Sequence, residues 1–245
     1  MTISNSLGLF FLEQIESKGN LQVLPEESSK HIIQVLRMRV GGPLQLTDGR
    51  GKTALAVITD DHKKRCEVRI ETITETSAPQ HQHTIAIALL KNNARFEWFL
   101  EKAAELGIKR IIPLLTVRTE KSHFRFERMK SILVSAMLQS QQAWLTDLSE
   151  PITFENWLKS SEDTSLSNAR FIAHCEPGEK ARLIDPEILP LPAKTVLIGP
   201  EGDFTPDEIQ QAMRLNYRPI TLGHTRLRTE TAGIVAATLL QQAGK

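Results

Sequence analysis

The 245-residue sequence is poor in the residues that mark several common protein classes. Its only two cysteines, Cys66 and Cys175, lie far apart, which predicts free thiols in a reducing compartment rather than a disulfide framework. No group of cysteines and histidines has the spacing of metal ligands, so we expect no metal site. Aromatic residues make up 5% of the chain, which leaves few side chains on which bases could stack.

Charge and long apolar segments are also scarce. The formal net charge is +1, so a polyanion would have to bind a local patch rather than follow a global field. The most apolar run, TIAIALL at 84–90, is far too short to span a bilayer. The amino-terminal MTISNSLGLFFLEQ lacks the basic segment and long apolar segment of a signal peptide. We therefore expect a soluble, cytoplasmic protein without membrane association.

Residues 1–78 have the pattern of a small β domain. Short strands are expected at 7–13 and 65–75, and a hairpin at 42–60 turns at Asp48-Gly49. One helix, at 25–39, interrupts them before Gly41. Several short strands with one helix are typical of a small β-barrel. The polar segment 77–84 is a suitable linker, and we place the domain boundary at 78/79.

Residues 79–245 alternate apolar strands with helices. Strands are expected at 84–90, 110–116, 170–175, 194–200 and 219–223, and helices at 94–107, 125–145, 205–216 and 229–243. This alternation predicts an α/β domain with a mostly parallel sheet. Open sheets of this kind bind ligands beyond the carboxyl ends of their strands.

The loop in LIGPEGDFTPDE, at 197–208, connects such a strand to a helix. Thr205 is expected as the N-cap, Pro206 as the first helical residue, and Glu208 as the partner in a capping box. Gly199 and Gly202 would let a ligand approach the backbone closely. The Walker and G-x-G-x-x-G phosphate patterns are absent, and Glu201 would repel phosphate, so a neutral or cationic ligand suits this loop better. A plain strand-to-helix turn is an equally reasonable interpretation of this loop alone.

A second loop, in ITLGHTRLRTETAG at 220–233, also leaves a strand and enters a helix. Thr229 is a candidate cap, and the helix dipole accounts for Glu230. Arg228 places a cation at a helix amino terminus, against that dipole. The side chain either points to solvent or has a functional partner.

Together the two loops resemble the SPOUT class of S-adenosylmethionine-dependent RNA methyltransferases, and the sequence is similar to the RsmE family in particular. HIIQVLRMRVGG (31–42), EKAAELGIKRIIPLLTVRT (101–119) and QSQQAWLTDLSEP (139–151) match further segments of that family in the same order. The resemblance covers the whole chain. Asp203 and Arg226 depart from the usual family pattern, as do Gln142 and Ala143.

The resemblance implies a fold and a cofactor. The carboxy-terminal domain would form a trefoil knot, residues 1–78 would form a PUA-like β-barrel that binds RNA, and the enzyme would act as a homodimer. The cofactor, S-adenosyl-L-methionine, would contact residues of both loops, namely Leu197, Ile198, Gly199, Pro200, Glu201, Gly202, Leu222, Gly223, Leu227, Thr229 and Ala232.

The activity implied by the resemblance is methylation of N3 of one uridine in 16S ribosomal RNA, either free or in the small ribosomal subunit. N3 lies on the Watson–Crick edge, so the base must be unpaired or flipped out. The candidate catalytic residues are Arg228, which would stabilise the uracil anion or orient a phosphate, and Glu201, which would accept a hydrogen bond or assist proton removal. Candidate RNA-binding residues come from the basic segments: Arg37, Arg39, Lys91, Arg95, Arg118 and Lys121.

Three other functions stay open. An enzyme of the same fold could methylate ribose 2′-hydroxyls of transfer or ribosomal RNA. A ribosome-assembly factor could bind RNA without catalysis, although intact cofactor loops argue against this. A Rossmann dehydrogenase is disfavoured because its glycine fingerprint is missing.

Overall fold

A computed structural model describes residues 7–120, 123–162 and 169–242 of the chain. The chain divides into two compact units. One comprises Met1–Ala78 together with Met137–Leu145, and the other comprises Pro79–Ala136 together with Thr146–Lys245. Within the described ranges, no helix has the length and apolar character that crossing a membrane requires.

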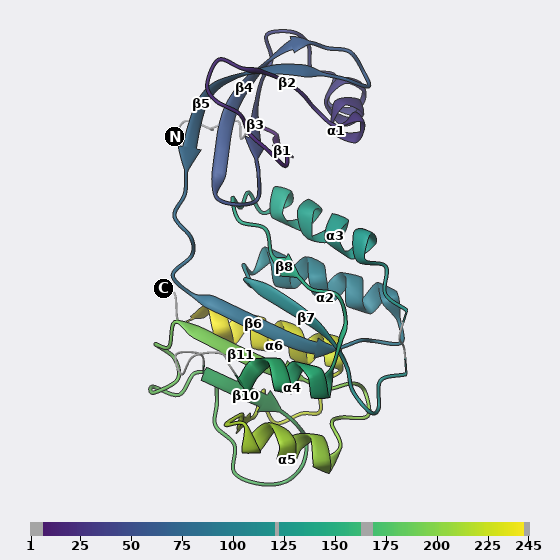
Figure 1. The fold of residues 1–245 in the computed structure, drawn as a ribbon, viewed down its shortest axis with the longest axis vertical. Coiled ribbons are helices and arrows are strands. Elements are labelled where there is room, and N and C mark those ends of the chain that lie inside the picture. Colours follow the sequence, from purple (N-terminus) through teal and green to yellow (C-terminus); the bar gives the residue numbers. More distant parts are fainter. Residues whose placement is uncertain (1–6, 121–122, 163–168, 243–245) are drawn as a thin grey trace. The chain divides into compact units, whose positions relative to one another are not determined.

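The first unit is built on a five-stranded sheet (Figure 1). Its strand order is β1-β3-β4-β5-β2, where only the β1–β3 pair is parallel. The strands are β1 (Leu9–Phe11), β2 (Leu21–Val23), β3 (Pro43–Thr47), β4 (Lys52–Asp60) and β5 (Glu67–Glu75). The hairpin predicted at 42–60 is confirmed, and an Asp48 carboxylate oxygen accepts from the backbone N–H groups of Arg50 (2.7 Å) and Lys52 (3.0 Å).

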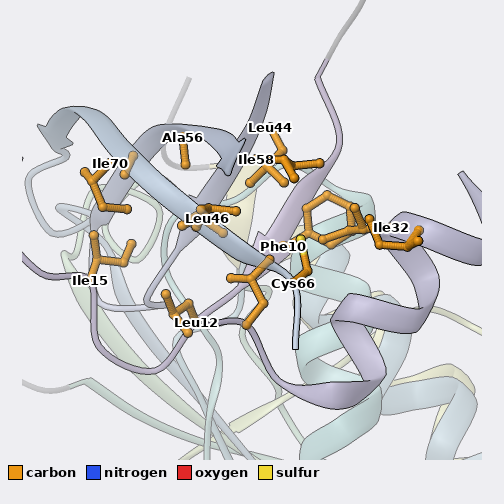
Figure 2. Packing of buried hydrophobic residues seen from close by; sticks show 14 residues of the cluster. Phe10, Leu12, Ile15, Ile32, Leu44, Leu46, Ala56, Ile58, Cys66 and Ile70 are labelled. Atoms are coloured by element: carbon orange, nitrogen blue, oxygen red, sulfur yellow. The ribbon is translucent and has the colours of Figure 1, made fainter. Parts of the chain in front are cut away.

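Alternating residues of these strands form the core of the unit. Figure 2 shows Leu44, Leu46, Ala56 and Ile58 beside Phe10, all buried in one apolar cluster. The helix α1 (Glu26–Lys30) continues as a π-helix over His31–Val35, which contributes Ile32 to this cluster. The helix predicted to extend to residue 39 ends earlier, since Arg37 adopts a left-handed backbone conformation with φ of 55°.

A segment from far along the chain completes this unit. Residues 143–145 run beside the β3–β4 turn, where Leu145 N–H donates to the Gly49 carbonyl (2.8 Å) and Gly51 N–H donates to the Ala143 carbonyl (2.9 Å). A Cβ atom on Gly51 would lie 2.5 Å from the Trp144 ring, so only glycine allows this close approach. The helix predicted at 125–145 therefore ends early, at Gln139.

The second unit contains a parallel sheet with the order β12-β10-β11-β6-β7-β8, and β9 also pairs with β7. All of these pairs are parallel. The strands are β6 (Gln82–Ala88), β7 (Arg110–Leu115), β8 (Asp147–Leu148), β9 (Ile152–Thr153), β10 (Ala169–Ala173), β11 (Ala193–Ile198) and β12 (Arg218–Ile220). The mostly parallel α/β sheet predicted from the sequence is confirmed.

Helices cover both faces of this sheet (Figure 1). On one face, α4 (Phe154–Glu162) and α5 (Pro206–Arg214) pack on Ala86, Ile172 and Leu197. On the other face lie α2 (Asn93–Glu105) and α6 (Thr229–Gln241), where a Cβ atom on Gly233 would lie 2.6 Å from the Phe99 ring. A further helix, α3 (Phe126–Gln139), leads from the second unit into the first.

Basic side chains are buried at the amino ends of the central strands. His83 on β6 and Lys194 on β11 occupy paired positions, and both are fully buried. The His81 ring stacks on His83 at a centroid distance of 5.5 Å, and the Lys194 ammonium group donates to the Leu189 carbonyl (2.8 Å). Burial, followed by the nearby charge of Lys194, lowers the pKa of His83 to about 4.

His83 should make the stability of the protein depend on pH. The unfolded chain binds a proton at His83 near pH 6.5, whereas the folded chain does so only near pH 4. The contribution of neutral His83 to the free energy of unfolding is therefore fully present above pH 6.5. It falls as the pH drops towards 4, by up to about 3 kcal/mol. Urea unfolding of His83→Phe should lose less stability across that window than wild type. The exposed His123→Phe should behave as wild type, and parallel curves for all three proteins would contradict this assignment.

Candidate functional site

The candidate site lies at the carboxyl ends of three adjacent strands. Ala173 ends β10, Ile198 ends β11 and Ile220 ends β12, and all three line one cavity of about 330 Å³. The loops that follow these strands form the rest of its walls. A volume in this range suits a small-molecule ligand, and the position is the one at which open α/β sheets bind ligands.

The loop after β11 begins the α5 helix as predicted. Thr205 is the N-cap, Pro206 opens the helix, and Glu208 forms the capping box with Thr205. The Glu208 carboxylate also accepts from the backbone N–H of Val117 (2.9 Å), so it holds a third segment against this loop. Gly199 lines the cavity as expected. A Cβ atom there would lie 3.1 Å from both the Phe204 ring and its backbone nitrogen, so this glycine also makes room for Phe204.

The loop after β12 enters the α6 helix at Thr229, the first residue of the predicted helix, but the N-cap lies one residue earlier than expected. Arg228 is the N-cap residue, and its side chain makes no capping hydrogen bond. Thr229, predicted as the cap, is buried and donates its hydroxyl to the Gly199 carbonyl (3.0 Å), which ties the two glycine-containing loops together. Gly223 has φ of 135°, and apart from its two chain neighbours no residue of the described chain has an atom within 4 Å of a Cβ built there, so it presents open backbone to the cavity.

The structure brings most of the predicted cofactor residues together around this cavity. Those that line it are Ile198, Gly199, Pro200, Glu201, Leu222, Gly223, Leu227, Thr229 and Ala232. The predicted cofactor residues Leu197 and Gly202 do not line it: Leu197 packs in the core under α4 and α5, and Gly202 presents its carbonyl to Arg118. The predicted catalytic residue Arg228 does not line it either. Arg228 is exposed between two lining residues.

The loop after β10 contributes residues that the sequence analysis missed. His174, Cys175 and Lys180 line the cavity. Both His174 ring nitrogens are buried without a hydrogen-bond partner in the part of the chain that the structure describes. The apolar run of β10 stops at these residues, but only the strand order shows that β10 lies between β11 and β12. These three residues could therefore be assigned to the cavity only once the strand order was known.

The predicted RNA-binding residues lie in both units, and their contacts with RNA stay a prediction. Arg118 donates to the Gly202 carbonyl (2.6 Å), Lys91 pairs with Glu120 (2.7 Å), and Arg95 lies 3.7 Å from Glu230. In the first unit Arg37 is exposed and Arg39 lies 3.8 Å from Asp61. Lys121 lies outside the described residues.

Two sequence families match the two parts of the chain. A family described as the RNA methyltransferase domain matches residues 76–241, and one described as the RNA methyltransferase PUA domain matches residues 24–71. A protein named ribosomal RNA small subunit methyltransferase E from Synechocystis is 33% identical over 211 residues, which is 84% of this chain and 68% of the relative.

Solved structures agree along nearly the whole chain. A "probable rRNA-methyltransferase" from Porphyromonas gingivalis is 35% identical with a TM-score of 0.86, covering 98% of this chain and 100% of that one. A ribosomal RNA small subunit methyltransferase E from Neisseria gonorrhoeae, bound to S-adenosyl methionine, is 29% identical with a TM-score of 0.85 over 96% and 97% of the two chains.

The fold and the cavity, taken with these matches, define an RNA methyltransferase with an appended PUA domain. Within that class, the chain belongs to the RsmE family, as the sequence motifs of its two loops predicted.

Proposed function

We propose that the protein transfers a methyl group from S-adenosyl-L-methionine to N3 of a uridine in 16S ribosomal RNA. The main support is the cavity at the carboxyl ends of β10, β11 and β12, which has a suitable volume and is lined by residues of both motif loops. Homologues over most of the chain are small-subunit ribosomal RNA methyltransferases, and one is solved with the same cofactor.

The residues of the cavity fit this cofactor. Gly223 leaves open backbone on one wall, and the ring nitrogens of His174 on another wall lack partners that a polar ligand would supply. Glu201 adds a carboxylate to the lining, which suits a cationic ligand. When bound, the cofactor would supply an electrophilic methyl group on a sulfonium.

The protein's own task is then to orient a uracil and remove its N3 proton. Arg228 is exposed beside the cavity, between Leu227 and Thr229, where its guanidinium would stabilise the negative charge that develops on the base. Glu201 is an exposed lining residue that would accept a hydrogen bond or the proton. Holding both reactants in line would supply a large part of the rate enhancement.

We assign RNA binding to the PUA-like unit, with Arg37 and Arg39 as phosphate contacts, and methyl transfer to residues 79–245. We expect the second unit to follow a knotted path and to pair as a homodimer in the cytoplasm, where ribosomes assemble. A molar mass by light scattering of twice the 27.5 kDa chain mass would support the dimer, and an active monomer would refute it.

The reaction product distinguishes this function from its alternatives. Purified protein, labelled S-adenosylmethionine and small subunits or free 16S RNA from a strain that lacks the gene should yield N3-methyluridine on nucleoside mass spectrometry. Ribose-methylated nucleoside would instead show a 2′-O-methyltransferase. RNA binding without any methylated nucleoside would show an assembly factor.

Gly223→Ala should weaken cofactor binding. A methyl group there would occupy open space at the cavity wall, and a φ of 135° strains any L residue. We expect at least about tenfold weaker binding of S-adenosylmethionine by calorimetry, equivalent to about 1.4 kcal/mol. Gly178→Ala is a matched control, since Gly178 has φ of 139° with equally open surroundings but does not line the cavity. Equal affinities for the two variants would contradict the assigned contact.

Arg228→Ala should slow methyl transfer and leave cofactor affinity unchanged. Removal of one preorganised donor commonly lowers a rate by about 10²–10³-fold. Arg37→Ala and Arg39→Ala should instead weaken RNA binding and reduce its salt dependence by about one unit per lost phosphate contact. Single-turnover methylation at saturating RNA separates the two effects. A wild-type rate for Arg228→Ala under these conditions would remove Arg228 from the catalytic step.

A further inference from the structure

His174 is the most unusual polar group in the cavity. It follows the last residue of β10 and lines the cavity beside Cys175, and both of its ring nitrogens are shielded from solvent. Neither nitrogen has a hydrogen-bond partner among the described residues. More than about 90% of buried polar groups in proteins are hydrogen-bonded, and an unpaired one costs about 1–3 kcal/mol. Because the His174 side chain lines the cavity, a turn of its ring would bring these nitrogens to a ligand there, which would supply the missing partners.

Neighbouring hydrogen bonds fix the backbone on which His174 stands. The backbone N–H of Cys175 donates to Asp203 Oδ2 (2.7 Å), and the backbone N–H of Phe204 donates to Asp203 Oδ1 (2.8 Å). Asp203 can reach both because it adopts a left-handed conformation with φ of 65°. Its carboxylate thereby fastens the loop after β10 to the loop after β11. The backbone next to the imidazole is therefore fixed before any ligand arrives.

The charge state of His174 follows from its surroundings. Burial lowers the pKa of the imidazole below its usual range, and the positive charge of Lys180 acts in the same direction. Asp203 and Glu176 oppose this shift without overcoming it. The other titratable or charged groups that line the cavity are Cys175, Glu201, His224 and Arg226. Near neutral pH the ring therefore has one donor nitrogen and one acceptor nitrogen, and it adds no positive charge to the cavity.

We propose that His174 is a positioning residue that hydrogen-bonds S-adenosylmethionine through its unpartnered ring nitrogens; this inference rests on the proposed function. It has a consequence for selectivity. A neutral imidazole tolerates the positively charged sulfonium of the cofactor, whereas a protonated one repels it. S-adenosylhomocysteine, the product left after methyl transfer, has a neutral sulfur and escapes this repulsion. Acid should therefore weaken cofactor binding more than product binding.

Calorimetry with both ligands, between pH 8 and pH 5, tests the proposal. His174→Ala should bind S-adenosylmethionine about tenfold more weakly at pH 8, the loss expected for one hydrogen bond. His174→Asn should recover part of this loss, since its amide can donate and accept. In wild type the ratio of the cofactor dissociation constant to the product dissociation constant should rise as the pH falls through the lowered pKa of His174, and in His174→Asn it should stay flat. The exposed His123→Ala should retain the wild-type ratio throughout.

The outcomes separate this inference from the proposed function. Wild-type affinity in His174→Ala, or the same pH dependence of the ratio in wild type and His174→Asn, would overturn the role of His174 and leave the methyltransferase assignment intact. Failure of the wild-type protein to bind either ligand would overturn the proposed function itself. Thermal unfolding of each variant identifies any loss of fold, and the KM for RNA should stay unchanged if His174 positions only the cofactor.

Discussion

Hydrogen bonds between loops that are distant in sequence hold the site open. The carboxyl ends of β10, β11 and β12 lie side by side because parallel pairing aligns them, but pairing alone leaves the following loops free. Thr229 joins the β12 loop to Gly199, and Asp203 joins the β11 loop to Cys175. Glu208 adds the segment at Val117. Side chains that form hydrogen bonds to the backbone of a neighbouring loop fix the cavity walls, so these polar contacts preorganise the site.

The sequence predicted the parts of this arrangement that depend on local rules. The capping box at Thr205 and Glu208, the hairpin turn at Asp48 and the long apolar strands β6 and β11 all follow from short-range chemistry. Strands β2, β8 and β9 were missed because two or three residues are too few to show a period. The first helix ended at Val35 and α3 ended at Gln139, each two residues before a non-glycine residue in a left-handed conformation, Arg37 and Gln141, which no composition rule anticipates.

The site was predicted for the two loops with glycine motifs and missed for the third. His174 and Cys175 belong to the cavity only because β10 inserts between β11 and β12, a fact of topology. Basic residues show a similar limit. Arg118, counted as an RNA contact, donates to the Gly202 carbonyl, and Lys91 pairs with Glu120. The sequence does not distinguish a basic residue that stabilises a loop from one that contacts a phosphate. A set of RNA-binding residues chosen from basic segments therefore includes both kinds.

The position of residues 143–145 has a consequence for folding during synthesis. The β3–β4 turn of the amino-terminal unit takes its last backbone partners, at Gly49 and Gly51, from residues that follow α3. A nascent chain that has exposed only residues 1–78 still lacks these partners, and Gly51 keeps an empty space where Trp144 will lie. The amino-terminal unit is thus completed during synthesis only after much of the methyltransferase unit has emerged. The two units mature together, and cutting the gene at the linker would separate a sequence domain without yielding a finished structural one.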